Sequence, residues 1–330
     1  MILLLSVQKD VHLDPIVEEL RRINAKFIRV NTDDLATSWR IVSRSRRDGD
    51  STTFTNLHNG KSFSWSAVTA VWYRRPNLPT EFLPHLADAC KDFAALETYS
   101  LVQHLLSSLP RRPVIWVSDP HVMSRANSRF VQFDAARNAG FNIPDTLISN
   151  DPDAVAQFAR TAETDTFAVK RISSHSRLDG NISFFTNCLS RTELIEKSAQ
   201  AQLCPTLVQH YIPKRCEYRV TVIGEAVFVC RLASQDNPTA RVDWRQTNPA
   251  FVGHEIVDSP AIAARTRTVV KTLGLNFGAV DLIETPNGEI VFLEVNPNGQ
   301  WLWIEQITGA RMTQAMTELL TSNATQLQVA

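Results

Sequence analysis

The order of apolar and polar positions predicts alternating strands and helices in the first third of the chain. Residues 1–7 form an apolar run typical of a buried strand, and residues 26–30 and 68–73 repeat it. After the first run, Asp14 and Pro15 precede an amphipathic stretch, as they do where a helix begins. Strands that alternate with helices in this way indicate a parallel α/β unit.

The remaining two thirds change to an α+β pattern. Helices are expected at about 128–138, at about 260–273 and near the C-terminal end. Short β-rich runs predict strands at 166–170, 181–186, 206–211, 216–223, 226–232, 276–284 and 290–295. Because prolines flank the segment 109–113, it is the first predicted boundary. The pattern therefore predicts three domains, at 1–112, 113–204 and 205–330.

Composition excludes several classes of function. The 330 residues include 34 Lys and Arg against 34 Asp and Glu, so there is no electrostatic signal for nucleic acid or an anionic membrane. The apolar runs are far shorter than the roughly 20 residues of a membrane-spanning helix, and the first run lacks the flanks of a signal peptide. The 5 cysteines contain no Cys-x-x-Cys pair, so we expect reduced thiols in the core. These features predict a cytoplasmic protein that binds neither nucleic acid nor a membrane.

The most informative segment is an acidic hairpin at residues 276–300. A loop of two or four residues around Gly288 pairs Asp281 with Glu294, whereas a loop of three residues shifts the pairing. We favour the four-residue loop, because Pro286 cannot donate a ladder hydrogen bond. The expected register therefore places the two carboxylates opposite each other.

Two carboxylates that face each other among apolar residues repel, and burial adds to the cost of their charge. A cation would compensate both charges, and Asn296, two residues beyond Glu294 on the same strand face, adds a neutral oxygen. Oxygen ligands without His or Cys are typical of Mg²⁺. The sequence therefore predicts Mg²⁺ bound by Asp281, Glu294 and Asn296. The alternative is that both acids pair with arginines at a sheet edge.

These acids resemble the magnesium signature of the ATP-grasp ligases, in which an Asp precedes a Glu-x-Asn triplet. Other segments resemble that family in the same order, namely Phe167-Ala-Val-Lys170, Leu207-Val-Gln-His-Tyr-Ile212 and Glu217-Tyr-Arg-Val220. The resemblance implies a lysine that reaches the nucleotide phosphates, a hinge that binds adenine and an acid that holds the ribose. The nucleotide-binding residues implied in this way are Arg129, Lys170, Gln209, Tyr211, Ile212 and Glu217.

A closer resemblance is to the branch that modifies ribosomal peptides, the microviridin-type or graspetide synthetases. The similar segments extend along nearly the whole chain and are Val71-Trp-Tyr-Arg-Arg-Pro76, 142–150, Asp243-Trp-Arg245 and 292–301. The resemblance implies a fold with α/β and α+β parts. In this three-lobed ATP-grasp fold, a flavodoxin-like N-terminal unit precedes two α+β lobes that clasp ATP.

The resemblance also implies a reaction. ATP phosphorylates an Asp or Glu side chain of a precursor peptide, which consists of a leader and an acidic core. A Ser or Thr hydroxyl or a Lys amine of the same peptide then captures the acyl phosphate. Such chemistry requires charge neutralisation and positioning more than a protein nucleophile. We expect Arg219 and Arg231 to steady the phosphoryl group or the carboxylate, with Arg245 as a further catalytic candidate.

Other functions stay open at this stage. An ATP-grasp ligase that adds an amino acid to a protein or small acid uses the same nucleotide site, but its product gains mass. A nucleotide-gated peptide-binding protein without turnover requires a broken metal site, whereas Asp281, Glu294 and Asn296 are all present. The loop at 171–180 contains a single glycine, which leaves its contact with phosphate in doubt. Relatives make a homodimer plausible.

Overall fold

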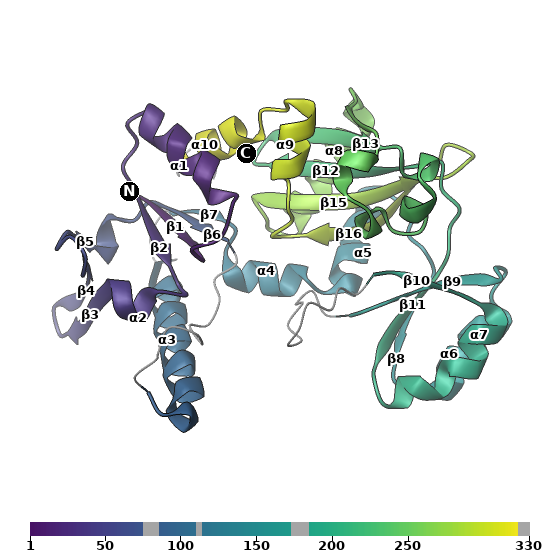
Figure 1. The fold of residues 1–330 in the computed structure, drawn as a ribbon, viewed down its shortest axis with the longest axis horizontal. Helices are drawn as coiled ribbons and strands as arrows, with labels where there is room; N and C mark the ends of the chain where they lie inside the picture. Colours follow the sequence, from purple (N-terminus) through teal and green to yellow (C-terminus); the bar gives the residue numbers. More distant parts are fainter. Residues whose placement is uncertain (75–85, 110–113, 173–184, 323–330) are drawn as a thin grey trace. The chain divides into compact units, whose positions relative to one another are not determined.

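The computed structural model describes residues 1–74, 86–109, 114–172 and 185–322. Their packing divides the chain into two compact units (Figure 1). The first unit contains Met1–Met123, Leu275–Phe277 and Arg311–Ala330, and the second contains Ser124–Gly274 and Gly278–Ala310. The predicted boundary at 110–113, most of the strand at 181–186 and most of the loop at 171–180 lie outside the described residues. The division into three domains stays a prediction.

A parallel sheet with strand order β2-β1-β6-β7 forms the centre of the first unit. Its strands are β1 (Ile2–Ser6), β2 (Phe27–Asn31), β6 (Ala70–Tyr73) and β7 (Ile115–Val117). The first strand lies inside the sheet between the second and the third, which is the order of flavodoxin-like units. The residues of strand β7 fall within the second predicted domain, but the strand pairs with β6 of the first unit. The first sheet therefore extends past the predicted boundary.

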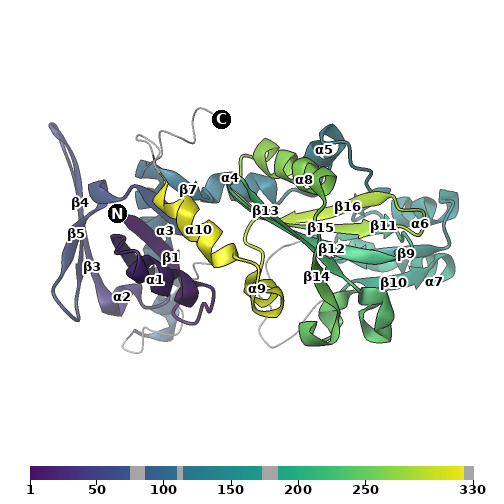
Figure 2. The same cartoon turned by 90° about the horizontal axis from the view of Figure 1, so that it is seen from above.

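Helices cover both faces of this parallel sheet (Figures 1 and 2). Helix α1 (Leu13–Arg22) contacts α10 (Met312–Thr321) on one face, and α3 (Asp88–Ser108) packs against the other. Helix α10 is the predicted terminal helix, but it belongs to the first unit and not to the C-terminal domain. The apolar stripe of α10 is buried, as its sequence requires. The element that α10 contacts is α1, and this pairing is set by the tertiary structure.

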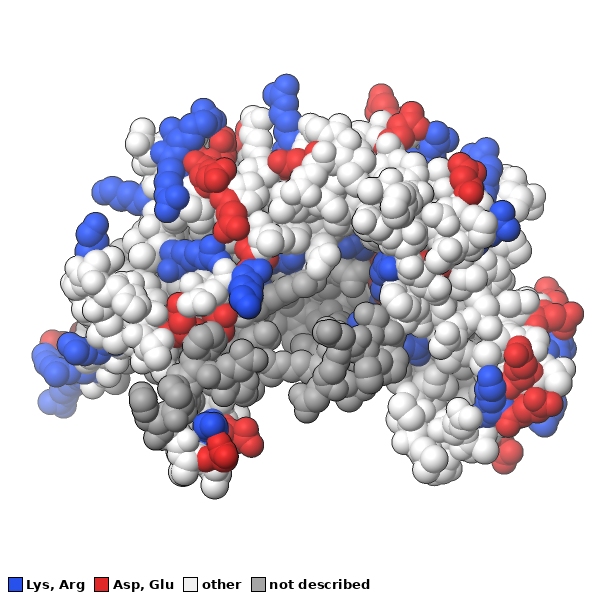
Figure 3. Space-filling model, viewed as in Figure 1, with Lys and Arg blue, Asp and Glu red and all other residues white. Residues whose placement is uncertain are grey.

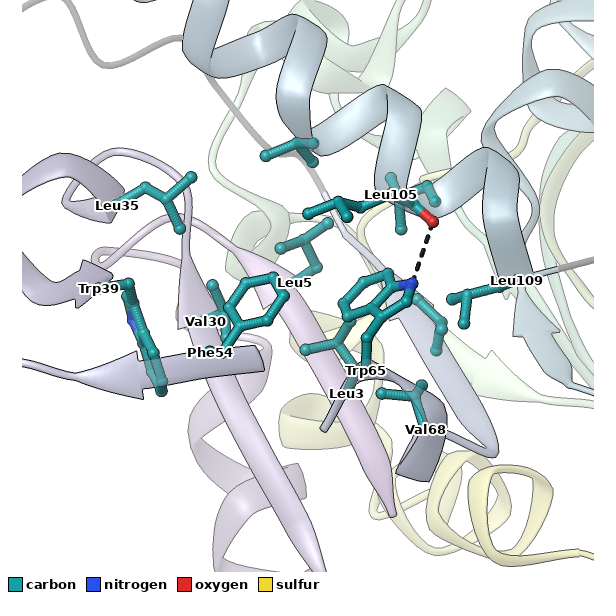
Figure 4. Close-up of a cluster of buried hydrophobic side chains, with 13 residues drawn as sticks. Leu3, Leu5, Val30, Leu35, Trp39, Phe54, Trp65, Val68, Leu105 and Leu109 are labelled. Carbon is teal, nitrogen blue, oxygen red and sulfur yellow. Dashed lines mark hydrogen bonds between the residues drawn. The ribbon is translucent and has the colours of Figure 1, made fainter. Parts of the chain in front are cut away.

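Figure 4 shows the core between the parallel sheet and α3. Leu3 and Leu5 point from β1 toward Leu105 of α3, and the indole nitrogen of Trp65 donates to the main-chain oxygen of Leu105 at 3.1 Å. The Trp65 ring also stacks on Phe54, with 5.2 Å between ring centroids. Phe54 belongs to an antiparallel sheet that consists of β3 (Trp39–Arg46), β4 (Gly49–Asn56) and β5 (Ser62–Ser64). This stacking joins the small sheet to the core.

The second unit contains two antiparallel sheets. One has the strand order β10-β9-β11-β8 and packs against α6 (Pro152–Thr161) and α7 (Arg191–Lys197). Its strands are β8 (Thr146–Ser149), β9 (Thr166–Lys170), β10 (Asn187–Ser190) and β11 (Thr206–His210). Phe167 and Val208 are fully buried under the two helices. Because side chains alternate along a strand, Lys170 points to the other face of this sheet.

The other sheet has the order β14-β13-β12-β15-β16, so β16 is an edge strand among the described residues. Its strands are β12 (Cys216–Ile223), β13 (Ala226–Leu232), β14 (His254–Ile256), β15 (Phe277–Glu284) and β16 (Ile290–Asn296). Helices α5 (Arg129–Asn138) and α8 (Pro260–Thr272) cover one face of it (Figure 2). Polar residues of this sheet line a cavity that these helices do not fill. Helices α2 (Leu35–Ser38), α4 (Pro120–Ala126) and α9 (Leu302–Thr308) are also present.

The surface agrees with the balanced composition. Acidic and basic side chains are interspersed over the described residues of the face in Figure 3. Among the described residues, no helix is both long and apolar enough to cross a membrane. The cysteines are free thiols, as expected, but Cys90 and Cys204 are exposed, so the prediction that they lie in the core is wrong for these two.

We predict that Leu106→Ala lowers the free energy of unfolding of the first unit by about 2–5 kcal/mol, because its side chain is 1% exposed. The matched control is Leu96→Ala on the same helix, whose side chain is 55% exposed and whose loss should cost less than about 0.5 kcal/mol. Urea unfolding followed by circular dichroism measures both. Equal losses would contradict the position of α3.

Candidate active site

One cavity in the second unit takes its walls from both antiparallel sheets. It is lined by all nine residues that were predicted to bind the nucleotide and the metal, which are Arg129, Lys170, Gln209, Tyr211, Ile212, Glu217, Asp281, Glu294 and Asn296. Arg245, one of the expected catalytic arginines, also lines it. The fold thus gathers residues that are up to 167 positions apart, from 129 to 296.

The acidic hairpin has the predicted pairing but not the predicted loop. Asp281 lies opposite Glu294 in the β15–β16 ladder. The amide of Thr285 donates to the carbonyl oxygen of Glu289 at 2.9 Å, which leaves a three-residue turn at 286–288. Gly288 adopts a φ of 83° there, a conformation that glycine enters at little cost. The prediction of a four-residue loop is therefore wrong.

A β-bulge restores the pairing that the shorter loop would have shifted. The register changes between Asp281, which faces Glu294, and Leu282, which faces Phe292, so that Leu293 is the additional residue. Neighbouring residues of a regular strand point to opposite faces, but Leu293 and Glu294 both line the cavity. The bulge thus places an apolar wall and a carboxylate side by side.

Each carboxylate of the pair is held by one arginine. Nη1 of Arg219 donates to Oδ1 of Asp281 at 2.8 Å, and Nη2 of Arg129 forms an ion pair with Oε2 of Glu294. The other oxygens turn toward Asn296, whose Nδ2 lies 3.3 Å from Oδ2 of Asp281 and 3.0 Å from Oε1 of Glu294. The alternative of arginine pairing at a sheet edge is therefore realised, but it occupies only one oxygen of each acid.

The remaining oxygens form a donor set that fits Mg²⁺. Among the described residues, no three His, Cys, Asp or Glu side chains gather in a metal-binding arrangement, so the set consists of two carboxylates and one amide. A half-turn of the Asn296 amide replaces its NH₂ group by its oxygen, so that three oxygens converge. Mg²⁺ commonly uses one or two carboxylates and completes its shell with water and phosphate.

The two buried carboxylates differ in their affinity for a proton. Burial raises the pKa of Asp281, and the charge of Glu294 adds to this, although Arg219 opposes both effects. Burial also works against ionisation of Glu294, but Arg129, Lys170 and Arg245 outweigh it and hold the pKa of Glu294 well below its usual range. The pair therefore carries one firmly ionised carboxylate and a second whose ionisation a cation would favour.

Lys170 is held at the cavity wall by the hinge. Its Nζ donates to Oε1 of Gln209 at 2.8 Å, and Nε2 of Gln209 donates to the Thr146 hydroxyl at 2.9 Å. Burial lowers the pKa of Lys170, while the nearby Glu294 raises it. Among the described residues, no carboxylate forms an ion pair with this ammonium group, and its contact with phosphate stays a prediction.

Lys214 is a cavity residue that the sequence analysis missed. Its Nζ lies 2.9 Å from Oε1 of Glu217 and 3.0 Å from the carbonyl oxygen of Val242, and its side chain is 5% exposed. Burial raises the pKa of Glu217, and Lys214 counteracts this. The position of Lys214 three residues before the predicted ribose-binding acid was the available signal, but a spacing of three residues carries no fixed geometry outside a helix.

Apolar side chains complete the lining of the cavity. They come from the hinge and from both sheets, and they are Pro144, Ala168, Ile212, Ile283 and Leu293. An apolar wall beside a group of cations suits a ligand with a flat ring and an anionic tail.

The expected catalytic arginines do not lie together. Because β12 pairs Arg219 with Cys230 and Tyr218 with Arg231, the side chains of Arg219 and Arg231 point to opposite faces of the sheet. Neither arginine is in the described cavity lining, but Arg219 contacts the cavity residue Asp281, whereas Arg231 forms an ion pair with Glu255 at 2.5 Å. The structure therefore does not support a joint role for the two arginines. The two-residue connection from β12 to β13 was the missed signal, since it fixes this register.

Arg245 is oriented by its neighbour. Its Nε and Nη2 donate to the two carboxylate oxygens of Asp243 at 2.8 and 2.6 Å, and the amide of Thr186 also donates to this carboxylate at 3.1 Å. Burial works against ionisation of Asp243, but these donors outweigh it and lower its pKa. The positive charge of Arg245 is thereby fixed at the cavity.

We predict that Gly299→Ala lowers the free energy of unfolding by about 1–3 kcal/mol, because a new methyl group would overlap Ala279 and lie 2.7 Å from Nη2 of Arg219. Gly253→Ala is the control, since its nearest neighbour, the methyl of Ala233, lies 3.3 Å away. Thermal unfolding measures both variants. If the two lose equal stability, the close packing of Gly299 against Arg219 is refuted.

The chain is similar to known ATP-grasp proteins. Residues 1–122 match the family model of the MvdD pre-ATP grasp domain. The macrocyclase MdnC from Microcystis aeruginosa, solved with its precursor peptide MdnA, is 27% identical, with a TM-score of 0.83 over 98% of this chain and 100% of MdnC. A RiPP-associated ATP-grasp ligase from Chryseobacterium gregarium, solved with ADP and a leader and core peptide, is 24% identical, with a TM-score of 0.86 over 97% and 96% of the two chains.

A third solved structure is the ATP-grasp ligase PsnB in complex with minimal precursor, Mg and ADP. It is 18% identical, with a TM-score of 0.74 over 98% of this chain and 97% of PsnB. No curated protein sequence matches the chain. The resemblance that the sequence predicted is confirmed, because residues 1–122 match the pre-ATP-grasp domain model and the chain is similar to ATP-grasp ligases over nearly its whole length.

Proposed function

We propose that this ligase is a peptide macrocyclase that uses ATP and Mg²⁺ to crosslink a ribosomal precursor peptide. The observation that supports this proposal is the partly buried pair of Asp281 and Glu294, whose remaining oxygens converge with Asn296 in a cavity that is lined by cations. Similarity to MdnC over 98% of the chain supports a peptide substrate, since that enzyme was solved with its precursor. We further propose that residues 113–204 and 205–330 form the two lobes that clasp ATP.

In this proposal Asp281, Glu294 and Asn296 hold the metal ion, and Lys170 contacts the phosphates. When bound, Mg²⁺ neutralises charge on the phosphate oxygens. Glu217, which is oriented by its contact with Lys214, accepts hydrogen bonds from the ribose hydroxyls, and the apolar residues that include Leu293 pack against the base.

The substrate reaction has two steps. An Asp or Glu carboxylate oxygen of the peptide attacks the γ-phosphorus of ATP, the bond to the β-phosphate oxygen breaks, and ADP leaves. A Ser, Thr or Lys side chain then attacks the acyl carbon, releases inorganic phosphate and loses a proton, so the peptide loses the elements of one water per crosslink. Fixed positive groups stabilise charge in such transfers, and Arg219 and Arg245 supply them here.

Intact mass spectrometry tests the proposal. The purified protein is incubated with Mg-ATP and the short acidic peptide encoded beside its gene. A mass loss of one water per crosslink, dependent on ATP, is expected. A mass gain would instead identify a ligase that adds an amino acid, and an unchanged peptide despite nucleotide binding would overturn the macrocyclase.

We predict that Glu294→Gln lowers the crosslinking rate by about 100-fold or more, because loss of even an outer partner of a metal ligand costs roughly 10–100-fold. The amide keeps the size of the side chain and the fold. Glu305→Gln, an acid of α9 outside the described cavity lining, is the control. The rate is measured at saturating peptide as Mg²⁺ is varied, and a wild-type rate would exclude Glu294 as a ligand.

We predict opposite outcomes for the two separated arginines. Arg219→Ala should lower the rate roughly 100-fold, as removal of a charge-stabilising donor does, whereas Arg231→Ala should change it less than about twofold because its side chain is on the other face. The same mass assay gives both rates. A comparable loss in the two variants would restore the original expectation for Arg231.

A further inference from the structure

Strand β16 carries two of the candidate metal ligands and lies at the edge of the described sheet. Glu294 and Asn296 flank Val295, so the main chain at Val295 sets the separation of the two ligands. The bulge at Leu293 lies directly before this segment, and a bulge interrupts the ladder that would otherwise hold it. An edge strand with a bulge needs a second partner to fix its position.

A side chain of α5 supplies that partner. Gln132 accepts from the Val295 amide through Oε1 at 2.9 Å and donates through Nε2 to the Val295 carbonyl at 2.8 Å. One carboxamide therefore contacts both main-chain groups of a single strand residue, as a neighbouring strand does. These contacts show that Val295 directs both groups away from β15, so the segment is held from both sides.

The carboxamide of Gln132 is fully used. Besides its two contacts with Val295, Nε2 donates to the carbonyl of Ala126 at 2.7 Å, and Oε1 accepts from Nη1 of Arg129 at 3.3 Å. A glutamine amide offers two donors and two acceptor positions, and all four are satisfied at a residue that is 1% exposed. Arg129 in turn pairs with Glu294. Gln132 is therefore connected to Glu294 both through Arg129 and through the neighbouring main chain of Val295.

We propose that Gln132 is a positioning residue of the metal site. It fixes the strand segment from Glu294 to Asn296 and orients the arginine that holds one oxygen of Glu294. This inference rests on the proposed metal site and goes beyond it, because it assigns a role to a residue that is not itself a metal ligand. Removing the carboxamide should weaken metal binding even where the fold persists, since the ligands would no longer be held at a fixed separation.

Mn²⁺ binding tests this without turnover. The full-length protein, without nucleotide or peptide, is titrated with Mn²⁺, and electron paramagnetic resonance measures free and bound ion. Gln132→Met, which keeps the length of the side chain but makes none of the hydrogen bonds, should raise the Kd by about 10–100-fold. Val291→Ala removes buried volume from the same strand and is the control for lost stability, and its Kd should stay within about twofold.

A second variant keeps the test decisive if Gln132→Met does not fold. Gln132→Glu can still accept from Val295 and Arg129 but cannot donate to Val295, so its Kd should also rise. A wild-type Kd in either folded variant, or an equal loss in Val291→Ala, would overturn the role of Gln132 while the metal site stands. Equal binding by wild-type protein and Glu294→Ala would remove the metal site and with it this proposal.

Discussion

The structure of the second unit depends on two carboxylates that face each other across a buried ladder. Asp281 and Glu294 would repel strongly among apolar neighbours, and no ordinary packing compensates such a pair. The chain surrounds them with Arg219, Arg129 and the amide of Asn296, each contacting particular oxygens. The cost of burying the acids is thus offset by groups from three separate segments, and the same arrangement leaves oxygens that a cation can use.

This constraint explains why the cavity lies where it does. The helices α5 and α8 cover one face of the sheet, and α5 supplies Arg129 to Glu294, while Lys170 and Arg245 contribute positive charge to the cavity. Positive groups and apolar side chains therefore line the same cavity as the acidic pair. Such a cavity separates the polar and flat parts of a ligand, as a nucleotide requires.

Much of the site could be predicted because strand periodicity and hairpin pairing are local properties. The facing of Asp281 and Glu294 followed from pattern alone, although the argument contained an error about the loop. Two deviations cancelled: the turn is one residue shorter than favoured, and the bulge at Leu293 shifts the register back. A bulge depends on what packs beside the strand, which no pattern within the hairpin contains.

The sequence by itself determined most of the strands, the facing of the acidic pair and the resemblance to ATP-grasp ligases, because these rest on residues close together in the chain. Only the tertiary structure decided that β7 joins the first sheet, that α10 packs on α1, that Arg231 faces away from Arg219, that Lys214 lines the cavity, and that Gln132 contacts Val295. The sequence shows that an amphipathic element or a buried polar side chain requires a partner. Many partners would satisfy this requirement, so the actual partner depends on the packing of the whole unit.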